Sequence, residues 1–437
     1  MSSVVDQRMR DELVEAARPQ RFGRLVELKG LHLLARGVDA AVGDLVEVTG
    51  DAGVVLAEVV ASAPTGLVCL PLSATNGLRA GARVRSTGSA LHVRVGQQLR
   101  GRILDGVGRP LDGGPSLAEL DLVPVQNAAP PALSRSRVDA QVGLGVRALD
   151  ALVPCGRGQR MGIMAGSGVG KSTLLSMIAR GTEATVSVIA LVGERGREVR
   201  EFIENDLGPE GLARSVVVVA TSDAPPVERL QAAFVATRIA EWFRDTGEHV
   251  LLMMDSLTRV AMAQREIGLS AGEPPATRGY PPSVFGVLPR LLERAGPGVT
   301  GSITGLYTVL VEGDDMQDPI GDATRSILDG HIALSRRLAT SGHYPSIDVL
   351  ESVSRVALSV TNRTQQDDAV TLRRLLAAHR DVRELVEIGA YAAGSDPDAD
   401  RALALLPRIN DFLRQRVDET DDPASTWAAL HTLLEQP

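Results

Sequence analysis

The arrangement of apolar and polar residues divides the chain into stretches of different periodicity. Between residues 23 and about 89, short apolar runs are interrupted by glycine and aspartate clusters such as Gly43-Asp44. Short runs at regular intervals, separated by such turn residues, are typical of small all-β domains. We therefore expect a small β-barrel over residues 21–90. Its expected strands lie near residues 24–28, 31–35, 45–48, 54–60, 67–72 and 83–85.

A different pattern begins near residue 138. From there to about residue 363, wholly apolar runs alternate with longer segments of helical periodicity. Runs of this kind indicate buried strands of a parallel sheet whose two faces are covered by helices, the doubly wound α/β class. The expected strands lie near residues 160–164, 187–192, 215–220, 250–254 and 301–310.

Strand signals end at about residue 364. Beyond it, apolar residues keep helical spacing, which predicts a small helical domain over residues 364–437. These apolar residues are Leu372, Leu375, Leu376, Val382, Leu385, Val386, Leu403, Leu406, Ile409 and Leu413. Residues 91–137 are rich in glycine and, near their end, in alanine and proline. We interpret them as a connection between domains.

The first residues form a segment of their own, residues 1–20. Val5, Met9 and Leu13 fall on one face of a predicted amphipathic helix over residues 3–18, and Pro19 ends it. An isolated helix of this length is marginal in water. The sequence leaves open whether the helix docks on its own domain or on a partner.

Composition narrows the class of protein. The 437 residues carry a net charge of −8, and 44% of them are apolar. Because non-specific nucleic-acid binding normally needs a basic face, we expect no nucleic-acid partner. Cys69 and Cys155 lack metal-ligand or redox spacing, so we predict that both are core residues. No apolar run approaches the roughly 20 residues that span a bilayer, and the chain does not start like a secretory signal, so we expect a cytoplasmic protein.

The strongest chemical signal is a glycine-rich segment at residues 165–172, AGSGVGKS. It follows a predicted strand, precedes a predicted helix, and fits a phosphate-binding loop except that Ala165 stands at the first glycine position. In such a loop the backbone amides and the helix N-terminus surround the phosphates. The chain has only two lysines, Lys29 and Lys171, and Lys171 occupies the position that contacts the β- and γ-phosphates.

This loop predicts binding of ATP with Mg²⁺, because the hydroxyl of Ser172 stands where such loops hold the metal. The alternative is an ordinary glycine turn before a helix. The nucleotide-binding residues predicted in the loop are Gly166, Ser167, Gly168, Val169, Gly170, Lys171, Ser172 and Thr173.

Two acidic residues follow predicted strands of the same sheet. Asp255 ends an apolar strand 84 residues after Lys171, where a buried acid can order the hydration shell of magnesium. Glu194 follows the strand that ends near residue 192, and a carboxylate there can orient the attacking water. Charged turns of this kind are also common on surfaces, so the residues alone leave the role of Glu194 open.

Several further segments, taken together with the glycine-rich loop, resemble one family. These segments are residues 193–202, 279–296, 311–319, 327–332 and 394–397. The chain resembles the ATPases of type III protein export, which include the flagellar export ATPase and its injectisome relatives and are cousins of the catalytic subunit of rotary ATP synthases. The resemblance runs from about residue 23 to residue 419.

The resemblance implies a RecA-like P-loop ATPase domain and a homohexameric ring with ATP bound at subunit interfaces. It implies that Glu194 is the catalytic glutamate and that Arg355 is an arginine finger, which stabilises the transferred phosphoryl group in the neighbouring subunit. Tyr344 falls where the relatives stack an aromatic ring on adenine, and Arg195 joins the expected nucleotide contacts. Without the family, Arg355 reads as a surface charge and Tyr344 as an ordinary core residue.

The resemblance also implies partners. The N-terminal helix would dock a stator-like regulatory protein, while the helical C-terminal domain would face the membrane export gate, the complexes of chaperones with export substrates, and a central stalk protein. The loop at residues 273–282 would line the pore of the ring, although it also reads as a rigid surface loop. These partners place the expected protein at the cytoplasmic face of the inner membrane.

The predicted function is therefore Mg²⁺-dependent ATP hydrolysis that drives flagellar protein export. The ATPase of a virulence secretion system is the nearest alternative, because it shares the motifs of the ATP site. An RNA-dependent ring helicase is disfavoured by the acidic charge and the few aromatic residues, which leave little for base stacking. A non-catalytic ring subunit is disfavoured because Lys171 and Glu194 are both present.

Overall fold

The computed structural model describes residues 21–311 and 318–435. These residues form two compact units, one of residues 21–91 with 270–272 and one of residues 92–269 with 273–435. The amphipathic helix predicted over residues 3–18 lies outside the described residues. No helix in the described part of the chain is both long and apolar enough to cross a membrane.

The first unit is a closed barrel of six strands in the order β1-β2-β5-β4-β3-β6. The strands are β1 (Phe22–Lys29), β2 (His32–Arg36), β3 (Asp44–Gly50), β4 (Gly53–Ala63), β5 (Gly66–Pro71) and β6 (Arg83–Ala90). Alternate residues of the strands point inward and form an apolar core that includes Leu25, Val46, Val59 and Cys69. Inward alternation is what a small barrel requires, and the predicted barrel is confirmed.

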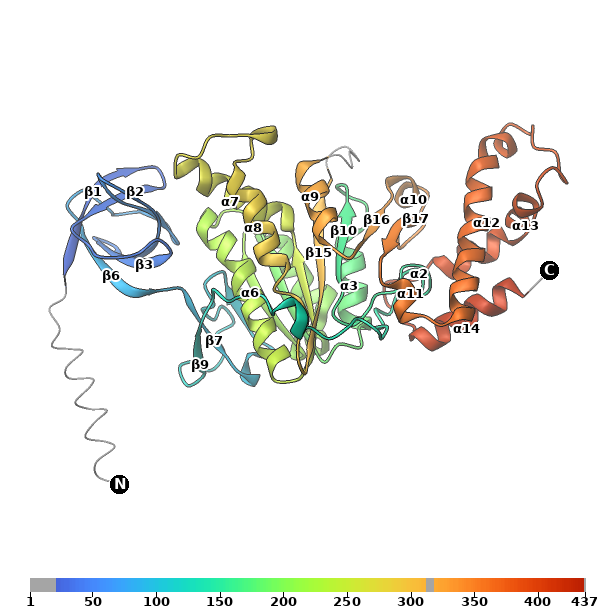
Figure 1. Ribbon diagram of the computed structural model, residues 1–437, viewed down its shortest axis with the longest axis horizontal. Helices are drawn as coiled ribbons and strands as arrows, with labels where there is room; N and C mark the ends of the chain where they lie inside the picture. Colours follow the sequence, from blue (N-terminus) through green and yellow to red (C-terminus); the bar gives the residue numbers. More distant parts are fainter. Residues whose placement is uncertain (1–20, 312–317, 436–437) are drawn as a thin grey trace, which may run out of the picture. The chain divides into compact units, whose positions relative to one another are not determined.

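The second unit is built on a sheet with the strand order β17-β16-β10-β15-β13-β11-β12-β8 (Figure 1). Its strands are β8 (Ile103–Asp105), β10 (Arg160–Ala165), β11 (Val186–Val192), β12 (Ser215–Ala220), β13 (His249–Asp255), β15 (Ser302–Leu310), β16 (Gly330–Leu334) and β17 (Ile347–Ser354), and β14 (Gly296–Pro297) pairs with β15. Neighbouring strands are parallel except that β17 runs antiparallel to β16 and β14 to β15. The predicted α/β class is confirmed, but the antiparallel edge strand was not predicted.

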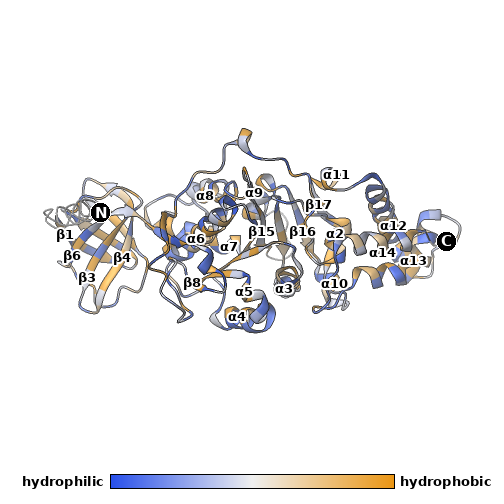
Figure 2. Ribbon diagram, turned by 90° about the horizontal axis from the view of Figure 1, so that it is seen from below, coloured by the Kyte–Doolittle hydropathy of each residue, from blue (hydrophilic) through white to orange (hydrophobic). Residues whose placement is uncertain are grey.

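Helices cover both faces of this sheet, as its composition requires, because every residue of β11, β12 and β13 is buried. Figure 2 shows α3, α4 and α5 on one face and α6, α8 and α9 on the other. The bounds are α3 (Lys171–Gly181), α4 (Gly196–Glu201), α5 (Gly208–Ala213), α6 (Pro226–Asp245), α7 (Leu257–Ser270), α8 (Pro282–Leu292) and α9 (Pro319–Ile327). In Figure 2 the strands of the sheet are mainly hydrophobic in colour, whereas α4 is mainly hydrophilic.

Residues 91–137, which we expected to be a connection, contain three short strands. β7 (His92–Val95) pairs with β9 (Asp121–Pro124), and β8 extends the large sheet by pairing with β12. β8 has three residues, too few for a periodic signal in the sequence. The end of the segment is fixed by Asn127, which donates a hydrogen bond of 2.8 Å to the fully buried Glu241. Glu241 also forms a bidentate ion pair with buried Arg294 at 2.7 and 2.8 Å.

The sheet is followed by the short helix α11 (Ala357–Val360) and then by three longer helices, α12 (Arg363–Glu387), α13 (Pro397–Leu413) and α14 (Pro423–Leu434). Each of the three longer helices begins at a capping side chain: Asn362 forms a capping box with Gln365, and Asp396 and Asp422 accept hydrogen bonds from the first-turn amides. Their apolar faces share one core with the short helix α2 (Arg147–Leu152) and with α3. The helical segment therefore packs directly on the half of the sheet that carries the glycine-rich loop (Figure 1).

Both cysteines are buried and free, as predicted for core residues. Cys69 lies inside the barrel, and Cys155 lies in the core that α2 shares with the sheet.

Candidate active site

The chemistry predicted from the sequence gathers at the carboxyl edge of the sheet. The glycine-rich loop leaves β10 after Ala165 and enters α3 at Lys171. Gly168 and Gly170 have φ values of 74° and 92°, which side chains rarely tolerate, so the loop needs glycine at both positions. The loop and the N-terminus of α3 line an open cleft, where their backbone amides can bind a phosphate.

Lys171 lies between two carboxylates. Its Nζ forms an ion pair with Asp255 and lies 3.6 Å from Oε1 of Glu194. β13, which ends at Asp255, and β11, which precedes Glu194, are neighbours in the sheet, with Leu191 level with Asp255. Thr308 on β15 donates a hydrogen bond of 2.7 Å to Oδ1 of Asp255. Three adjacent strands thus hold this charged cluster in place.

Glu194 sits on a tightly fixed turn. The preceding Gly193 has a φ of 73° and donates its amide to Ala220 at 2.7 Å, while the carbonyl of Glu194 accepts from Ser222 at 3.0 Å. Burial raises the pKa of the Glu194 carboxyl to about 7; nearby Lys171 opposes this rise, and the negative charge of Asp255 adds to it. A carboxyl group with a pKa near neutrality can exchange a proton at working pH, as a general base must.

Lys171 and Glu194 line a cleft of about 1760 Å³, whereas Asp255 and Thr308 are buried beside it and are not among the lining residues. Its lining includes nine lysine or arginine side chains and six aspartate or glutamate side chains, an excess of positive charge that suits an anionic ligand. Except for Val169, every predicted residue of the glycine-rich loop lines the cleft, as do Glu194, Arg195 and Tyr344. Val169 is fully buried, and its carbonyl accepts a hydrogen bond from Ser346.

The far end of the cleft is formed by Tyr344 and by residues 414–419 between α13 and α14. The ring of Tyr344 lies against the loop: a Cβ on Gly170 would meet it at 3.3 Å. Gln415 donates its amide to the carbonyl of Tyr344 at 3.0 Å, and its buried side chain bonds Arg147 and the carbonyl of Gly145 at 2.9 and 2.8 Å. The helical segment is thereby joined to the cleft beside the aromatic ring.

Magnesium would find two protein oxygens here, the hydroxyl of Ser172 and the carboxylate of Asp255. In the part of the chain that the structure describes, no group of three or more His, Cys, Asp or Glu side chains is arranged to hold a metal ion. Mg²⁺ in phosphate-transfer sites is usually held by one or two protein groups, with phosphates and water completing the octahedron. The donor set therefore fits a metal that arrives with the nucleotide.

Arg355 lies apart from all of these residues. It directly follows β17, which starts beyond Tyr344 and runs antiparallel to β16, so β17 ends at the amino edge of the sheet. The eight residues of β17 span about 25 Å at a rise of about 3.3 Å per residue. The exposed side chain of Arg355 donates a hydrogen bond of 3.2 Å to the carbonyl of Arg325.

The structure adds three residues that the sequence analysis missed: Thr308, Gln415 and Arg259. Arg259, in the first turn of α7, lines the cleft against Gly193, and its buried Nε donates no hydrogen bond to the described residues. Its position four residues after Asp255, at the start of a helix on the same edge of the sheet, is a signal that could have found it. Thr308 and Gln415 contact the site through tertiary structure, so no local pattern marks them.

The fold and the cleft define a P-loop ATPase, and comparisons with known proteins agree. Residues 145–354 match the ATP synthase alpha/beta family, nucleotide-binding domain, and residues 361–432 match the C-terminal domain of the type III secretion ATPase EscN.

Known relatives extend this match to nearly the whole chain. The chain is 49% identical to the flagellum-specific ATP synthase of Bacillus subtilis (95% of each chain) and 50% identical to the type 3 secretion system ATPase of Xanthomonas euvesicatoria (97% and 96%). The structure of assembled EscN from enteropathogenic E. coli superposes with a TM-score of 0.90 at 44% identity, covering 94% of this chain and all of that one. The structure of assembled EscN in complex with its central stalk EscO superposes with a TM-score of 0.88. The chain belongs to the type III secretion ATPases of the ATP synthase alpha/beta family, and it is an ATPase.

The raised pKa of Glu194 predicts a pH-dependent gain in stability for Glu194→Gln. The folded state binds the Glu194 proton more tightly than the unfolded chain does, and this tighter binding stabilises the folded state at low pH. The parent protein therefore loses stability as pH rises from about 4.5 to about 7. Glutamine does not titrate, so the Glu194→Gln variant has no such pH-dependent loss of stability. Relative to the parent, the variant should gain on the order of 2 kcal/mol between pH 4.5 and pH 8, measured by urea unfolding without nucleotide. A difference that does not change with pH would contradict the assignment.

The contacts of Gln415 predict that Gln415→Leu weakens nucleotide binding more than turnover. The change leaves the amide of Arg147 and the carbonyl of Gly145 unpaired, so residues 414–419 lose their anchor beside Tyr344. We expect about 1–3 kcal/mol of destabilisation and a KM for ATP raised several-fold, with kcat changed less than twofold. Gln366→Leu on α12 is the matched control, because its amide bonds only carbonyls of residues 358 and 361. An unchanged KM for Gln415→Leu would be the contrary result.

Proposed function

We propose that ATP is hydrolysed between two copies of this chain, with one copy supplying the cleft and the next supplying Arg355. The observation that carries this proposal is the placement of the two half-sites. Lys171 and Glu194 face the cleft at the carboxyl edge of the sheet, whereas Arg355 is exposed at the amino edge. Since β17 separates Arg355 from its own cleft by about 25 Å, the guanidinium reaches a γ-phosphate only in a neighbouring chain.

Within the cleft, each group has a defined task. The amides of residues 166–173 and the ammonium of Lys171 bind the phosphates, and Arg259 supplies an unsatisfied donor for a further phosphate oxygen. Ser172 and Asp255 would hold Mg²⁺, which would supply positive charge to offset that of the phosphates. Tyr344 and Arg195 also line the cleft, where Tyr344 would stack on the adenine and Arg195 would contact the nucleotide.

Glu194 orients the attacking water and accepts its proton. Its carboxylate is fixed by the turn at Gly193 and Ser222 and lies close to the ammonium that binds the γ-phosphate. The raised pKa makes it a stronger base than an exposed glutamate. Arg355 of the neighbouring copy then stabilises the charge that develops on the transferred phosphoryl group.

The assembly that this arrangement requires is a closed ring, because each interface joins the front of one chain to the back of the next. We propose a homohexamer in which all interfaces are equivalent, since one chain carries both half-sites. The relatives that superpose on this chain include an assembled ATPase and its complex with a central stalk, which supports a ring with a stalk protein in its pore.

We further propose that hydrolysis energises flagellar protein export. A flagellum-specific relative at 49% identity over 95% of the chain supports this assignment. The ring would act at the cytoplasmic face of the inner membrane on complexes of chaperones with export substrates, beside the export gate and a stator-like regulator. The alternative is virulence secretion, which the relative from Xanthomonas euvesicatoria supports at 50% identity.

The shared site predicts complementation between two inactive variants. Lys171→Ala disables the phosphate site of its own chain, and Arg355→Ala removes the finger, which should lower kcat by about 10³-fold or more while nucleotide binding persists. Rings assembled from a mixture of the two contain interfaces with an intact cleft and an intact finger. ATP hydrolysis, measured by phosphate release, should therefore reappear on mixing.

The control for this experiment is a mixture of two cleft variants, Lys171→Ala with Glu194→Gln. Both disable the same half-site, so no competent interface forms and no activity should return. If the first mixture also stays inactive, or if Arg355→Ala hydrolyses ATP at the parental rate, the shared site is wrong.

The two export assignments are separated by deletion of the gene in the source organism. Flagellar export predicts loss of swimming in soft agar and loss of external filaments. Restoration should require a chain with intact Lys171. Lys29→Ala changes the other lysine, whose exposed side chain pairs with Glu27 in the barrel, and this variant should restore swimming fully. A deletion strain that swims normally would favour virulence secretion instead.

A further inference from the structure

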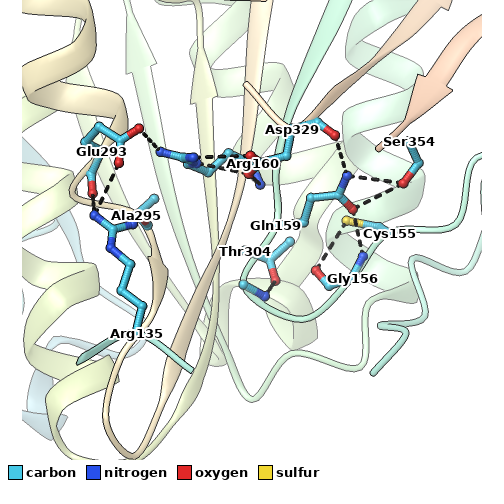
Figure 3. A network of polar contacts seen from close by, with 11 residues as sticks. Arg135, Cys155, Gly156, Gln159, Arg160, Glu293, Ala295, Thr304, Asp329 and Ser354 are labelled. Atoms are coloured by element: carbon cyan, nitrogen blue, oxygen red, sulfur yellow. Dashed lines mark hydrogen bonds and ion pairs between the residues drawn. The ribbon is translucent and has the colours of Figure 1, made fainter. Parts of the chain in front are cut away.

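A polar cluster occupies the amino edge of the sheet, at the opposite end of β10 from the glycine-rich loop. We define the Asp329 cluster as Gln159, Arg160, Asp329 and Ser354, which Figure 3 shows facing one another from the start of β10, the turn before β16 and the end of β17. None of these residues lines the nucleotide cleft. The cluster adjoins Arg355 in the chain.

Asp329 is held from two sides by Arg160. Its carboxylate accepts hydrogen bonds from the backbone amide, Nε and Nη2 of Arg160 at 3.1, 3.0 and 3.2 Å, and its amide donates to the carbonyl of Arg160 at 2.9 Å. The Arg160 side chain is only 13% exposed. A charge-assisted pair with this many contacts in a partly buried position fixes the backbone as well as the side chains.

The backbone carbonyl of Asp329 in turn holds Arg355. It accepts hydrogen bonds from the amide of Arg355 at 3.0 Å and from Nε2 of Gln159 at 2.9 Å. The same Nε2 lies 3.2 Å from the hydroxyl of Ser354, which donates to the carbonyl of Pro154 at 2.7 Å. Gln159 is fully buried, so its bonds are not exchanged with water.

The close pairing of β16 with β17 adds to this hold. Gly330, which follows Asp329, is level with Ser354, and a Cβ at Gly330 would lie 2.3 Å from the carbonyl of Val353. Only glycine permits this approach. The backbone of Arg355 is therefore fixed on several sides, whereas its exposed guanidinium makes one hydrogen bond to the described residues, to the carbonyl of Arg325.

We propose that Asp329, held by Arg160 and Gln159, is the positioning residue for Arg355 and sets the reach of the finger into the neighbouring copy. Because Arg160 begins β10 and Ala165 ends it, one six-residue strand joins the support of the finger to the chain's own phosphate loop. This inference rests on the role of Arg355 proposed above.

Asp329→Asn tests the inference, because it keeps the size of the side chain and removes one of the two carboxylates that pair with Arg160, the other being Glu293. A finger displaced by about 1 Å can cost up to about 100-fold, so we expect kcat to fall about tenfold or more with KM for ATP changed less than twofold. In a double-mutant cycle, the variant that combines Asp329→Asn with Arg355→Lys should have a kcat no lower than that of Arg355→Lys alone.

Mixed rings give a readout that a merely structural role would not produce. In the mixture of Lys171→Ala and Arg355→Ala chains, only the Lys171→Ala chain supplies a finger. Adding Asp329→Asn to that chain should lower the recovered activity about tenfold, whereas adding it to the Arg355→Ala chain should lower it far less. Glu248→Gln is the matched control, because it also changes a carboxylate to an amide at the amino edge: Glu248 precedes β13 and pairs with Arg100 at 2.8 Å, not with Arg160.

Each outcome decides the matter. Equal loss from either chain, or a loss that is additive with Arg355→Lys, would mean that Asp329 only stabilises the fold, and the inference would be overturned while the shared site stands. If Asp329→Asn lowers the recovered activity only when it is added to the Arg355→Ala chain, then Asp329 acts on the phosphate loop of its own chain, and the inference is overturned as well. If the starting mixture shows no recovery, the shared site fails first and this inference falls with it.

Discussion

A single topological constraint underlies the whole arrangement: parallel strands end at one edge of a sheet, and an antiparallel strand ends at the other. β10, β13 and β11 bring Lys171, Asp255 and Glu194 together at the carboxyl edge. β17 reverses direction and carries the chain from Tyr344, beside that edge, to Arg355 at the opposite one. In the proposed mechanism, one chain thus bears two half-sites that it cannot join by itself, and association becomes part of the chemistry.

The charged cluster at the carboxyl edge contains ion pairs of Lys171 that a bound nucleotide would have to replace. In the free chain Lys171 pairs with Asp255 and lies near Glu194, so the ammonium is already neutralised. The phosphates of a bound nucleotide would compete with these two carboxylates for the ammonium. The loop amides and Arg259 would favour the phosphates by donating further hydrogen bonds to them. Losing Lys171 as a partner would leave Glu194 with a higher pKa, and Mg²⁺ near Asp255 would have the opposite effect. In the proposed mechanism, the state of the nucleotide therefore sets the basicity of Glu194, the group that would act on water.

Much of this was readable from the sequence, for physical reasons that differ between elements. The fully buried strands β11, β12 and β13 are continuous apolar runs, and the loop before α3 needs glycine at fixed positions, so both leave strong local signals. β8 and β17 do not: β8 is three residues long, and β17 has mixed burial at the edge of the sheet. Asp329 and Gln415 act through partners far away in the chain, and Arg355 needs a second copy to have any role.

The most direct measurement is the specific ATPase activity of the purified protein over a dilution series, with the oligomeric state recorded in the same samples by mass photometry in the presence of Mg²⁺ and ATP. If the site is shared between copies, activity per chain follows the fraction of chains in closed rings and vanishes for monomers. Monomers that hydrolyse ATP at the full rate would contradict the account.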